Sequence, residues 1–251
     1  MFEIEAISVD EIKTLVNTAS VILQEITFEV DDEGLKFRSM DSSHSALVDA
    51  ILKKDYFSKF DCPKPTRFAL YSETLKKIMK IMDTGKEVRI KFDGDDINFK
   101  SAGKDFTFHV IEPLLPAPLP KLTYNSEFKI SLNTWKKILD DISTLSHTIK
   151  IQSLVNSLVF DGQGESGEGH IELKKAVDEA LLKLDVKEES HARYNLDMLI
   201  PISKQASSDL LARYSTQMPI EISWKLLLDK QSISSEIGEV KFYLAPIVDQ
   251  K

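Results

Sequence analysis

A five-residue stretch, Glu33-Gly34-Leu35-Lys36-Phe37, returns in altered form later in the chain as Asn156-Ser157-Leu158-Val159-Phe160. The closing phenylalanines, at 37 and 160, are 123 positions apart. Two further pairs have the same separation: Tyr71 with Tyr194, each opening a helical pattern, and Ile97 with Ile220, each in a short alternating segment. Because unrelated segments rarely match three times at one offset, the chain is predicted to consist of two similar units.

A proline-rich segment separates the two units. Residues 112–122 contain Pro113, Pro116, Pro118 and Pro120, a density that excludes a helix interior or a central strand. We therefore predict an N-terminal domain at residues 1–112, an extended connecting loop at 113–127 and a C-terminal domain at 128–251. The leucines of this connector are unusual for a linker, and either pack onto the sheets or serve a partner at the surface.

The composition is typical of a packed, non-membrane protein. Of the 251 residues, 42% are hydrophobic and 29% are charged, which argues against global disorder. No apolar run approaches the roughly 20 residues that span a bilayer, and no signal peptide opens the chain. The single cysteine, Cys62, excludes an intramolecular disulfide and favours a reducing, intracellular setting.

Within each unit, hydrophobic periodicity predicts short antiparallel strands and two helices. In the first unit Ser8 is expected to cap a helix, with Glu11 completing a capping box, and a second helix is expected to start near Ser72. The strands of this unit are expected at residues 1–7, 26–30, 35–39, 46–52, 87–92, 96–100 and 106–111. The helices of the second unit are expected at residues 133–145 and 195–205. Helices that share one face of such a sheet give an α+β fold.

The distribution of charge matters more than its total. The net charge of −8 argues on average against phosphate binding. The four expected helices, however, carry lysines beside their apolar stripes: Lys13, Lys76, Lys77, Lys80, Lys136, Lys137 and Lys204. This layer sums to +1 and the remainder of the chain to −9. It is either an ordinary solvated helix face or a surface that meets phosphates without reading sequence, since base-reading arginine clusters and aromatic platforms are missing.

Two motifs resemble those of the DNA sliding clamps called proliferating cell nuclear antigen, PCNA. One is Ser39-Met40-Asp41-Ser42-Ser43-His44, similar to the family's SMDSSH signature, and the other is Lys241-Phe242-Tyr243-Leu244-Ala245-Pro246, similar to its YLAP ending. Residues 160–165 and 167–173 follow the family's Gly-rich hairpin, and residues 217–220 follow its short turn before a late strand. Essentially the whole chain aligns with the family, and the short tail and proline-rich connector resemble archaeal members.

The resemblance implies a closed ring of three subunits and six similar domains, with helices lining the hole and strands outside. Double-stranded DNA, bound without sequence specificity, would face Lys13, Lys77, Lys80, Lys137 and Lys204, while Lys76 and Lys136 are added from helical position alone. The sequence departs from the family at three positions. Asp140 replaces a usual basic residue and weakens that part of the lining, and Pro201 is expected to kink the last helix or shift its start. Ile247 replaces a usual cation, so one charged contact near the partner pocket is lost.

The resemblance also implies a socket for a short motif, the PCNA-interacting-protein box, carried by DNA polymerase, the clamp loader replication factor C, flap endonuclease and DNA ligase. The matching positions are Met40, His44, Leu47, Leu119, Pro120, Leu122, Met218, Pro219, Tyr243, Ala245 and Pro246. A methionine-lined apolar socket suits aliphatic and aromatic anchors, and a peptide can pair with the C-terminal strand edge. Ser45 replaces an apolar residue of the family, so a more polar rim is expected.

The subunit interface is expected where two strand edges meet. The strand at 106–111 of one subunit is predicted to pair antiparallel with the strand at 169–174 of the next, because each is otherwise an exposed edge. The side chains expected at this interface are Phe106, Phe108, Val110, Gly169, Ile171 and Leu173.

Two alternatives to a homotrimeric, non-catalytic processivity factor stay open. Gly162, Gly164, Gly167 and Gly169 could suggest the phosphate loop of an enzyme, but a strand at 170–174 rather than a helix is expected to follow. The five histidines lack metal-ligand spacing, and no cofactor, metal or catalytic residue is expected. The second alternative is one subunit of a heterotrimeric or checkpoint-type clamp. In an archaeon the protein is expected in the cytoplasm, associated with the nucleoid. In a eukaryote it is expected in the nucleus.

Overall fold

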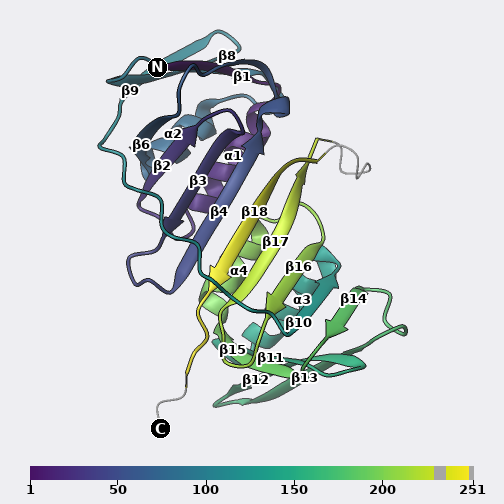
Figure 1. The fold of residues 1–251 in the computed structure, drawn as a ribbon. Helices are drawn as coiled ribbons and strands as arrows, with labels where there is room; N and C mark the ends of the chain where they lie inside the picture. Colours follow the sequence, from purple (N-terminus) through teal and green to yellow (C-terminus); the bar gives the residue numbers. More distant parts are fainter. Residues whose placement is uncertain (229–235, 249–251) are drawn as a thin grey trace. The chain divides into compact units, whose positions relative to one another are not determined.

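The computed structural model describes residues 1–228 and 236–248, and the chain divides into two compact units. The first unit contains Met1–Pro118 and Leu226–Val240, and the second contains Leu119–Lys225 and the chain from Lys241 onward. Within the described residues both halves of the chain have the same order of elements: a strand, a helix, five strands, a second helix and three strands (Figure 1). The predicted internal repeat is therefore confirmed.

The first unit is built from antiparallel strands and two helices. Its elements are β1 (Phe2–Ala6), α1 (Val9–Ala19), β2 (Glu25–Val30), β3 (Gly34–Met40), β4 (Ala46–Lys53), the 3-10 turn η1 (Lys54–Tyr56), β5 (Phe57–Asp61), β6 (Thr66–Tyr71), α2 (Ser72–Ile81), β7 (Val88–Phe92), β8 (Asp96–Ser101) and β9 (Lys104–His109). One sheet has the order β5-β1-β7-β8-β9, and β4, β3, β2 and β6 are neighbours in that order in another.

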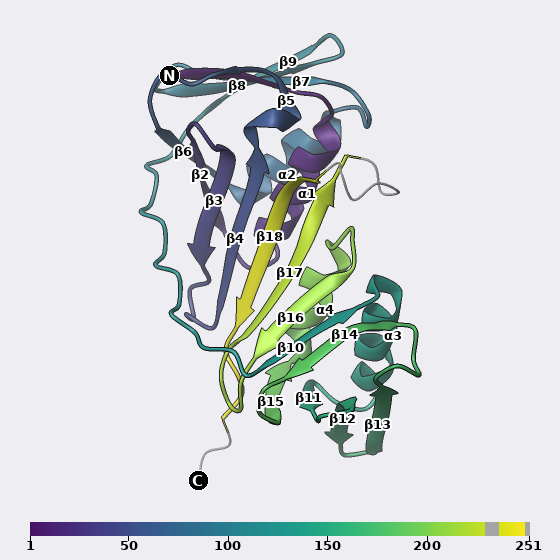
Figure 2. The ribbon, with the colours of Figure 1, turned by 45° about the vertical axis from the view of Figure 1, so that its right-hand side comes forward.

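The second unit repeats this plan. Its elements are β10 (Ser126–Ile130), α3 (Leu132–Ser143), β11 (Thr148–Ser153), β12 (Ser157–Gly164), β13 (Gly167–Lys174), β14 (Leu181–Val186), β15 (Ser190–Asn195), α4 (Leu196–Lys204), β16 (Leu210–Tyr214), β17 (Ile220–Leu227) and β18 (Glu236–Leu244), whose residues up to Val240 group with the first unit. One sheet has the order β13-β12-β11-β15, and β14, β10, β16 and β17 are neighbours in another. Figure 2 shows α3 beside these strands.

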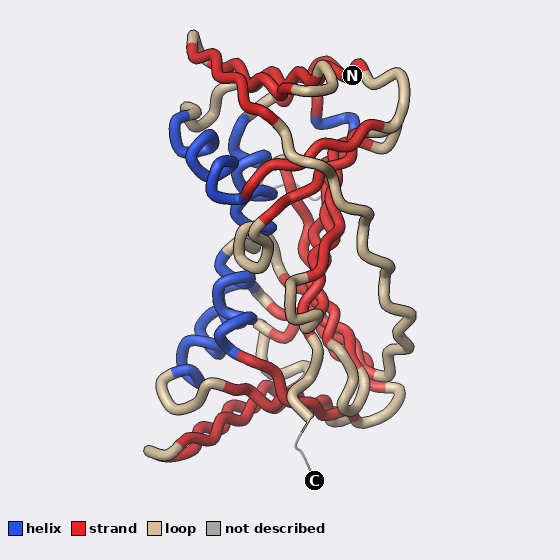
Figure 3. Tube along the Cα trace, turned by 90° about the vertical axis from the view of Figure 1, so that its left-hand side faces the viewer, coloured by secondary structure: helices blue, strands red, loops and turns tan. Residues whose placement is uncertain are grey.

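In each unit the two helices pack together on one side of the strands, as the tube in Figure 3 shows. The predicted apolar stripes face the core, because Ile12, Ile78, Ile138 and Ile142 are all at most 3% exposed. The segment just after α3 lies so close to β12 that position 164 requires glycine, because a Cβ atom there would lie 1.7 Å from the carbonyl oxygen of Leu145. The glycine run is therefore part of the β12–β13 hairpin, as predicted, and this packing explains the residue type there.

The expected capping box at the start of α1 was wrong. Ser8 does cap α1, but its hydroxyl accepts from the Asp10 amide, and the amide of Ser8 donates to the Tyr56 hydroxyl rather than to Glu11. The Glu11 carboxylate instead accepts a hydrogen bond from Tyr56 over 2.6 Å. A tertiary contact thus replaces the local capping box.

The tyrosine match of the repeat was also wrong. Leu70 pairs with Ile26 in the first unit, whereas Tyr194 pairs with Ile149 in the second, so Tyr194 corresponds to Leu70. Burial agrees, because Tyr194 is 0% exposed and Tyr71 is 52% exposed. A one-residue slip exchanges the buried and exposed faces of a strand.

Several elements differ from expectation. The helix expected at residues 133–145 spans Leu132–Ser143, and strands β5 and β6 were not expected. The last strand of the first unit ends at His109, and Ile111 makes only an isolated bridge to Ala69. Helix α4 starts at Leu196 and contains Pro201, so this proline does not shift the helix start. Because proline has no amide hydrogen, the carbonyl of Asp197 receives no helical bond from it. No helix within residues 1–228 and 236–248 is both long and apolar enough to cross a membrane.

Candidate nucleic-acid and partner interfaces

The lysines of α2 form an exposed cationic surface of the first unit. Lys76, Lys77 and Lys80 are exposed, and the buried stripe of Leu75, Ile78 and Met79 turns their side chains away from the core. Lys76 Nζ lies 3.7 Å from the Glu73 carboxylate, an exposed pair that contributes little to stability. Lys77 and Lys80 have no hydrogen bond or ion pair among the described residues. Their charges are free to meet an anionic ligand.

In the second unit the lysines are divided between two helices. Lys137 on α3 and Lys204 on α4 are exposed, and within the described residues neither makes an ion pair or hydrogen bond. Lys136 and Lys204 line one small depression of about 40 Å³ together with Asp140. The carboxylate of Asp140 lowers the positive potential there.

Lys13 and Lys136 differ from the other five lysines in burial and in contacts. Both are half-buried. Lys13 Nζ donates to the Met82 carbonyl over 2.9 Å, and Lys136 Nζ donates to the Ala206 carbonyl over 3.4 Å. The structure thus directs both ammonium groups to backbone carbonyls of their own unit.

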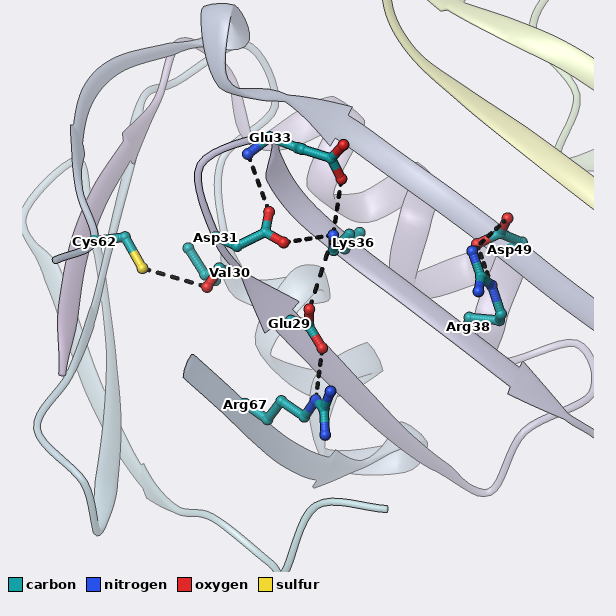
Figure 4. Close-up of polar contacts among 9 residues, drawn as sticks. All are labelled: Glu29, Val30, Asp31, Glu33, Lys36, Arg38, Asp49, Cys62 and Arg67. Carbon is teal, nitrogen blue, oxygen red and sulfur yellow. Dashed lines mark hydrogen bonds and ion pairs between the residues drawn. The ribbon is translucent and has the colours of Figure 1, made fainter. Parts of the chain in front are cut away.

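The charged sheet face of the first unit is compensated, in contrast to α2. Lys36 on β3 lies 2.5 Å from Asp31 and 2.9 Å from Glu33, while Glu29 accepts from Arg67 over 2.6 Å (Figure 4). Burial alone would lower the pKa of Lys36, but the hydrogen bonds from Asp31 and Glu33 outweigh it, so this pKa lies above its usual value. Cations on this face are held by carboxylates and are not available to phosphates.

The SMDSSH segment contains the last two residues of β3 and a following loop that is organised by Asp41. The amides of Ser43, Ser45 and Ala46 all donate to its carboxylate, over 3.2, 2.8 and 2.7 Å. Burial opposes ionisation of Asp41, yet the hydrogen bonds from Ser43 and Ala46 outweigh burial and hold its pKa below the usual value. Sequence reasoning noted the motif but not this role, although an aspartate two residues before a serine is a signal for an Asx turn.

Around this loop lie the first unit's candidate partner residues. Met40 and Leu47 are cross-strand partners on β3 and β4. Leu47 is buried, Met40 is half-buried, and His44 is exposed with a positive φ of 57°. The hydroxyl of Ser45 points back to Ser43 and Asp41, which binds it within the loop. Met40 and His44 are therefore the members of this set that offer surface to a ligand.

In the second unit, the candidate partner residues come from the connector end, the β16–β17 turn, and the end of β18 with the segment after it. Leu119 and Met218 are about two-fifths exposed, at 41% and 40%. Pro120, Leu122, Pro219, Ala245 and Pro246 are half-buried, and Tyr243 is buried. Leu119 and Met218 present the apolar side chains that a ligand of this unit can cover.

Two tyrosines that were not among the predicted site residues hold these segments in place. The hydroxyl of Tyr194 donates to the Met218 carbonyl over 2.9 Å, and that of Tyr124 donates to Glu221 over 2.8 Å. Burial, followed by the hydrogen bond to Glu221, raises the pKa of Tyr124, so it stays a donor. Residues 97 positions apart make this second contact, and no local pattern signals it.

The proposed interface strands are edges of the sheets described for their own units. β9 is the last strand of β5-β1-β7-β8-β9, and β13 is the first strand of β13-β12-β11-β15. Phe106 is 37% exposed, Phe108 and Val110 are half-buried, and on the other edge Gly169 and Ile171 are half-buried while Leu173 is buried. Each edge thus combines unpaired backbone groups with partly exposed apolar side chains.

Comparison with known families assigns both units. The profile described as "Proliferating cell nuclear antigen, N-terminal domain" matches residues 1–104, and the profile described as "Proliferating cell nuclear antigen, C-terminal domain" matches residues 118–247. The chain belongs to the proliferating cell nuclear antigen family. The resemblance inferred from the motifs at residues 39–44 and 241–246 is confirmed.

Relatives within the PCNA family cover nearly the whole chain. A protein of Cenarchaeum symbiosum named DNA polymerase sliding clamp is 30% identical over 245 residues, which are 95% of each chain. One of Nitrosopumilus maritimus with the same name is 30% identical over 246 residues, or 96% of each chain. Both relatives are archaeal proteins.

Solved PCNA structures share the fold. A structure described as the C-terminal region of FEN-1 bound to A. fulgidus PCNA matches with a TM-score of 0.89 at 17% identity, covering all of both chains. The PCNA of Thermococcus kodakaraensis matches with a TM-score of 0.88 at 22% identity, over 98% of this chain and all of the other. At these identities the likeness concerns the fold, which is the predicted α+β arrangement of two similar domains.

Proposed function

We propose that this chain is a DNA sliding clamp and polymerase processivity factor, which encircles duplex DNA and tethers replication and repair enzymes to it. The observation that carries the proposal is the set of exposed lysines on the helices of both PCNA-type units. Lys77, Lys80, Lys137 and Lys204 have no carboxylate partner within the described residues, whereas Lys36, Arg38 and Arg67 on the sheet face are paired.

This contrast suits a protein that is acidic overall. Free lysines attract the phosphates of any duplex, because phosphate contacts carry no sequence information. Outside the helical layer the remaining net charge of −9 opposes nonspecific adhesion of DNA. A closed ring needs only loose contacts, since topology rather than affinity keeps it on the DNA. The proposed phosphate-facing residues are Lys76, Lys77, Lys80, Lys137 and Lys204.

The partners proposed for the clamp are proteins that carry a PCNA-interacting-protein box, namely DNA polymerase, replication factor C, flap endonuclease and DNA ligase. The partly exposed Leu119 and Met218 support an apolar docking surface on the second unit. A structure with FEN-1 bound to a PCNA of the same fold supports the flap endonuclease in particular. The proposal assigns the chain no catalytic step and places it inside the cell, with the chromosome.

The ring is proposed to be a homotrimer in which β9 of one subunit pairs with β13 of the next. Native mass spectrometry of the chain alone tests the stoichiometry. A mass of three chains is expected, while a monomer that trimerises only with other clamp subunits supports the heterotrimeric alternative.

The encircling function is tested by loading the protein with a clamp loader onto a nicked circular plasmid and then cutting the plasmid. A sliding ring stays on the circle through gel filtration and dissociates after linearisation. Protein that stays on the linear DNA would be bound by direct contact, and protein never retained on the circle would not be a clamp. Either result contradicts the proposal.

A further inference from the structure

Lys13 and Lys136 are equivalent positions of the two units, and each reaches the C-terminal end of the neighbouring helix. Lys13 Nζ lies 2.9 Å from the carbonyl oxygen of Met82, the C-cap of α2, and 3.3 Å from the Thr84 hydroxyl. Lys136 Nζ lies 3.4 Å from the carbonyl oxygen of Ala206, which follows Gln205, the C-cap of α4. The same contact therefore occurs twice, independently.

The chemistry of a helix end explains this contact. The last carbonyls of a helix have no intrahelical partner and carry the negative end of the helix dipole, so a cation is stabilised there. α2 and α4 have the exposed Lys80 and Lys204 in their own last turns, and Lys13 and Lys136 add a second cation to each of these ends from the neighbouring helix. An ammonium group that is hydrogen-bonded to these carbonyls is less able to reorient toward a DNA phosphate.

Other bonds join the same segments. In the first unit, the Val9 amide donates to the Lys86 carbonyl over 2.8 Å, and the Gly85 amide donates to the Asp10 carboxylate over 3.0 Å. In the second unit, the Leu132 amide donates to Asp209 over 3.2 Å. The first turns of α1 and α3 are thus tied to the segments that follow α2 and α4, with the lysines as the cationic members of these ties.

We propose that Lys13 and Lys136 are positioning residues, which hold the two helices of each unit together at one end so that the exposed lysines keep their spacing against the duplex. They are not phosphate contacts themselves. This inference rests on the proposed DNA-encircling function. It predicts that the seven candidate lysines divide into two classes with different effects on DNA binding.

The salt dependence of DNA affinity separates three roles. Removing a phosphate contact lowers the slope of log affinity against log salt by about 0.9. Removing a positioning residue weakens affinity by the same factor at every salt concentration and leaves the slope unchanged. A residue that matters only for stability changes the melting temperature but not the affinity of the folded protein.

The experiment compares Lys13→Met with Lys80→Met, and Lys136→Met with its exposed neighbour Lys137→Met, in the full-length protein. Affinity for a short duplex is measured between roughly 50 and 200 mM salt, a range over which the number of phosphate contacts changes affinity strongly. Lys13→Met and Lys136→Met should bind roughly two- to fivefold more weakly with the wild-type slope. Lys80→Met and Lys137→Met should have a shallower slope. Lys13→Arg, which keeps a donor for the Met82 carbonyl, should restore wild-type affinity.

Each outcome supports or overturns the positioning role. If Lys13→Met reduces the slope at least half as much as Lys80→Met does, Lys13 is a phosphate contact and the inference fails. It also fails if Lys13→Met changes neither affinity nor slope. If Lys13→Met does not fold, Thr84→Val, which removes the second acceptor, takes its place with the same expectation.

A second readout does not involve DNA. Amide hydrogen exchange at residues 82–85 should be faster in Lys13→Met than in wild type, because the end of α2 is less well held. If exchange at residues 82–85 is the same in Lys13→Met as in wild type, the positioning role is contradicted, even where the wild type binds DNA as proposed. Absence of any salt-dependent affinity in the wild type would also contradict the positioning role, which requires phosphate contacts. Failure of the wild type to stay on the circular plasmid would instead contradict the proposed function.

Discussion

The indole Nε1 of Trp135 on α3 donates a hydrogen bond to the hydroxyl of Ser203 on α4 over 2.8 Å, and both side chains are at most 2% exposed. Two residues 68 positions apart thus join the helices of the second unit through a buried polar contact. A buried donor without its acceptor costs far more than an exposed one, because water cannot replace the missing partner.

Ser203→Ala leaves the Trp135 indole without this acceptor. We expect the free energy of unfolding to fall by about 1–3 kcal/mol. Chemical denaturation followed by tryptophan fluorescence measures the change. Ser143→Ala, an exposed serine of α3 that bonds only within its own helix, is the matched control and should change stability by about 0.5 kcal/mol or less. Equal effects of the two substitutions would contradict this assignment.

Asp41 should make the stability of the first unit depend on acid. Its pKa is lower in the folded state than its ordinary value, so its contribution is present above that ordinary value and is lost as pH falls through the folded value. Asp41→Asn should lower the free energy of unfolding at pH 7 by about 1–3 kcal/mol. The difference between wild type and variant should shrink below about pH 4. The exposed Asp32→Asn is the control in denaturant titrations across pH, and a constant difference would rule out this role for Asp41.

Phe106→Ala should weaken the proposed subunit interface. Burying a phenylalanine contributes about 1.5–3 kcal/mol, which corresponds to roughly a ten- to hundredfold change in association. Analytical ultracentrifugation should show monomers at concentrations where wild type forms trimers. Val155→Ala, an equally apolar but 61% exposed site in the β11–β12 turn, should leave the trimer intact. A stable Phe106→Ala trimer would move the interface elsewhere.

Lys77→Ala combined with Lys80→Ala should impair DNA binding through charge. The salt slope of duplex affinity should fall by about one unit for each phosphate contact that is removed, and clamp-dependent DNA synthesis should decline. Lys183→Ala removes an exposed cation of β14 that is paired with Glu127, and is expected to bind DNA as wild type does. Full processivity of the double variant at low and high salt would mean that these lysines do not face the duplex.

Leu119→Ser combined with Leu122→Ser should weaken the binding of a PCNA-interacting-protein-box peptide at least tenfold. Full burial of a leucine side chain by a ligand contributes about 1.5–3 kcal/mol to binding, and this contribution is smaller here because both leucines are already partly buried in the free protein. Titration calorimetry measures it. Leu115→Ser changes a connector leucine that is 82% exposed and lies outside the proposed socket, and should bind the peptide normally. Undiminished affinity of the double variant would show that the two leucines only pack the connector down.

Periodic and local features could be predicted from sequence because neighbouring residues cause them. The apolar stripes of all four helices, the β12–β13 hairpin and the turn from Asp31 to Gly34 follow from spacing and residue type. The 123-residue offset was right at Phe37 and Phe160 but off by one at the tyrosines, since strand register depends on pairing partners. Site residues could be nominated by motif, while their state of exposure could not.

By itself the sequence determined that this protein has two similar units, two helices in each, and lysines beside every helical stripe. Those properties depend on side-chain periods of two residues in strands and 3.6 residues in helices, which arise from residues close together in the sequence. Only the tertiary structure decided which lysines are free. Lys13 meets a carbonyl 69 positions away and Lys136 one 70 positions away, while Lys80 and Lys137 meet none in the described chain. Whether a lysine ammonium group is hydrogen-bonded within the protein depends on the groups that folding brings beside it. No local sequence pattern predicts contacts between residues so far apart in the chain.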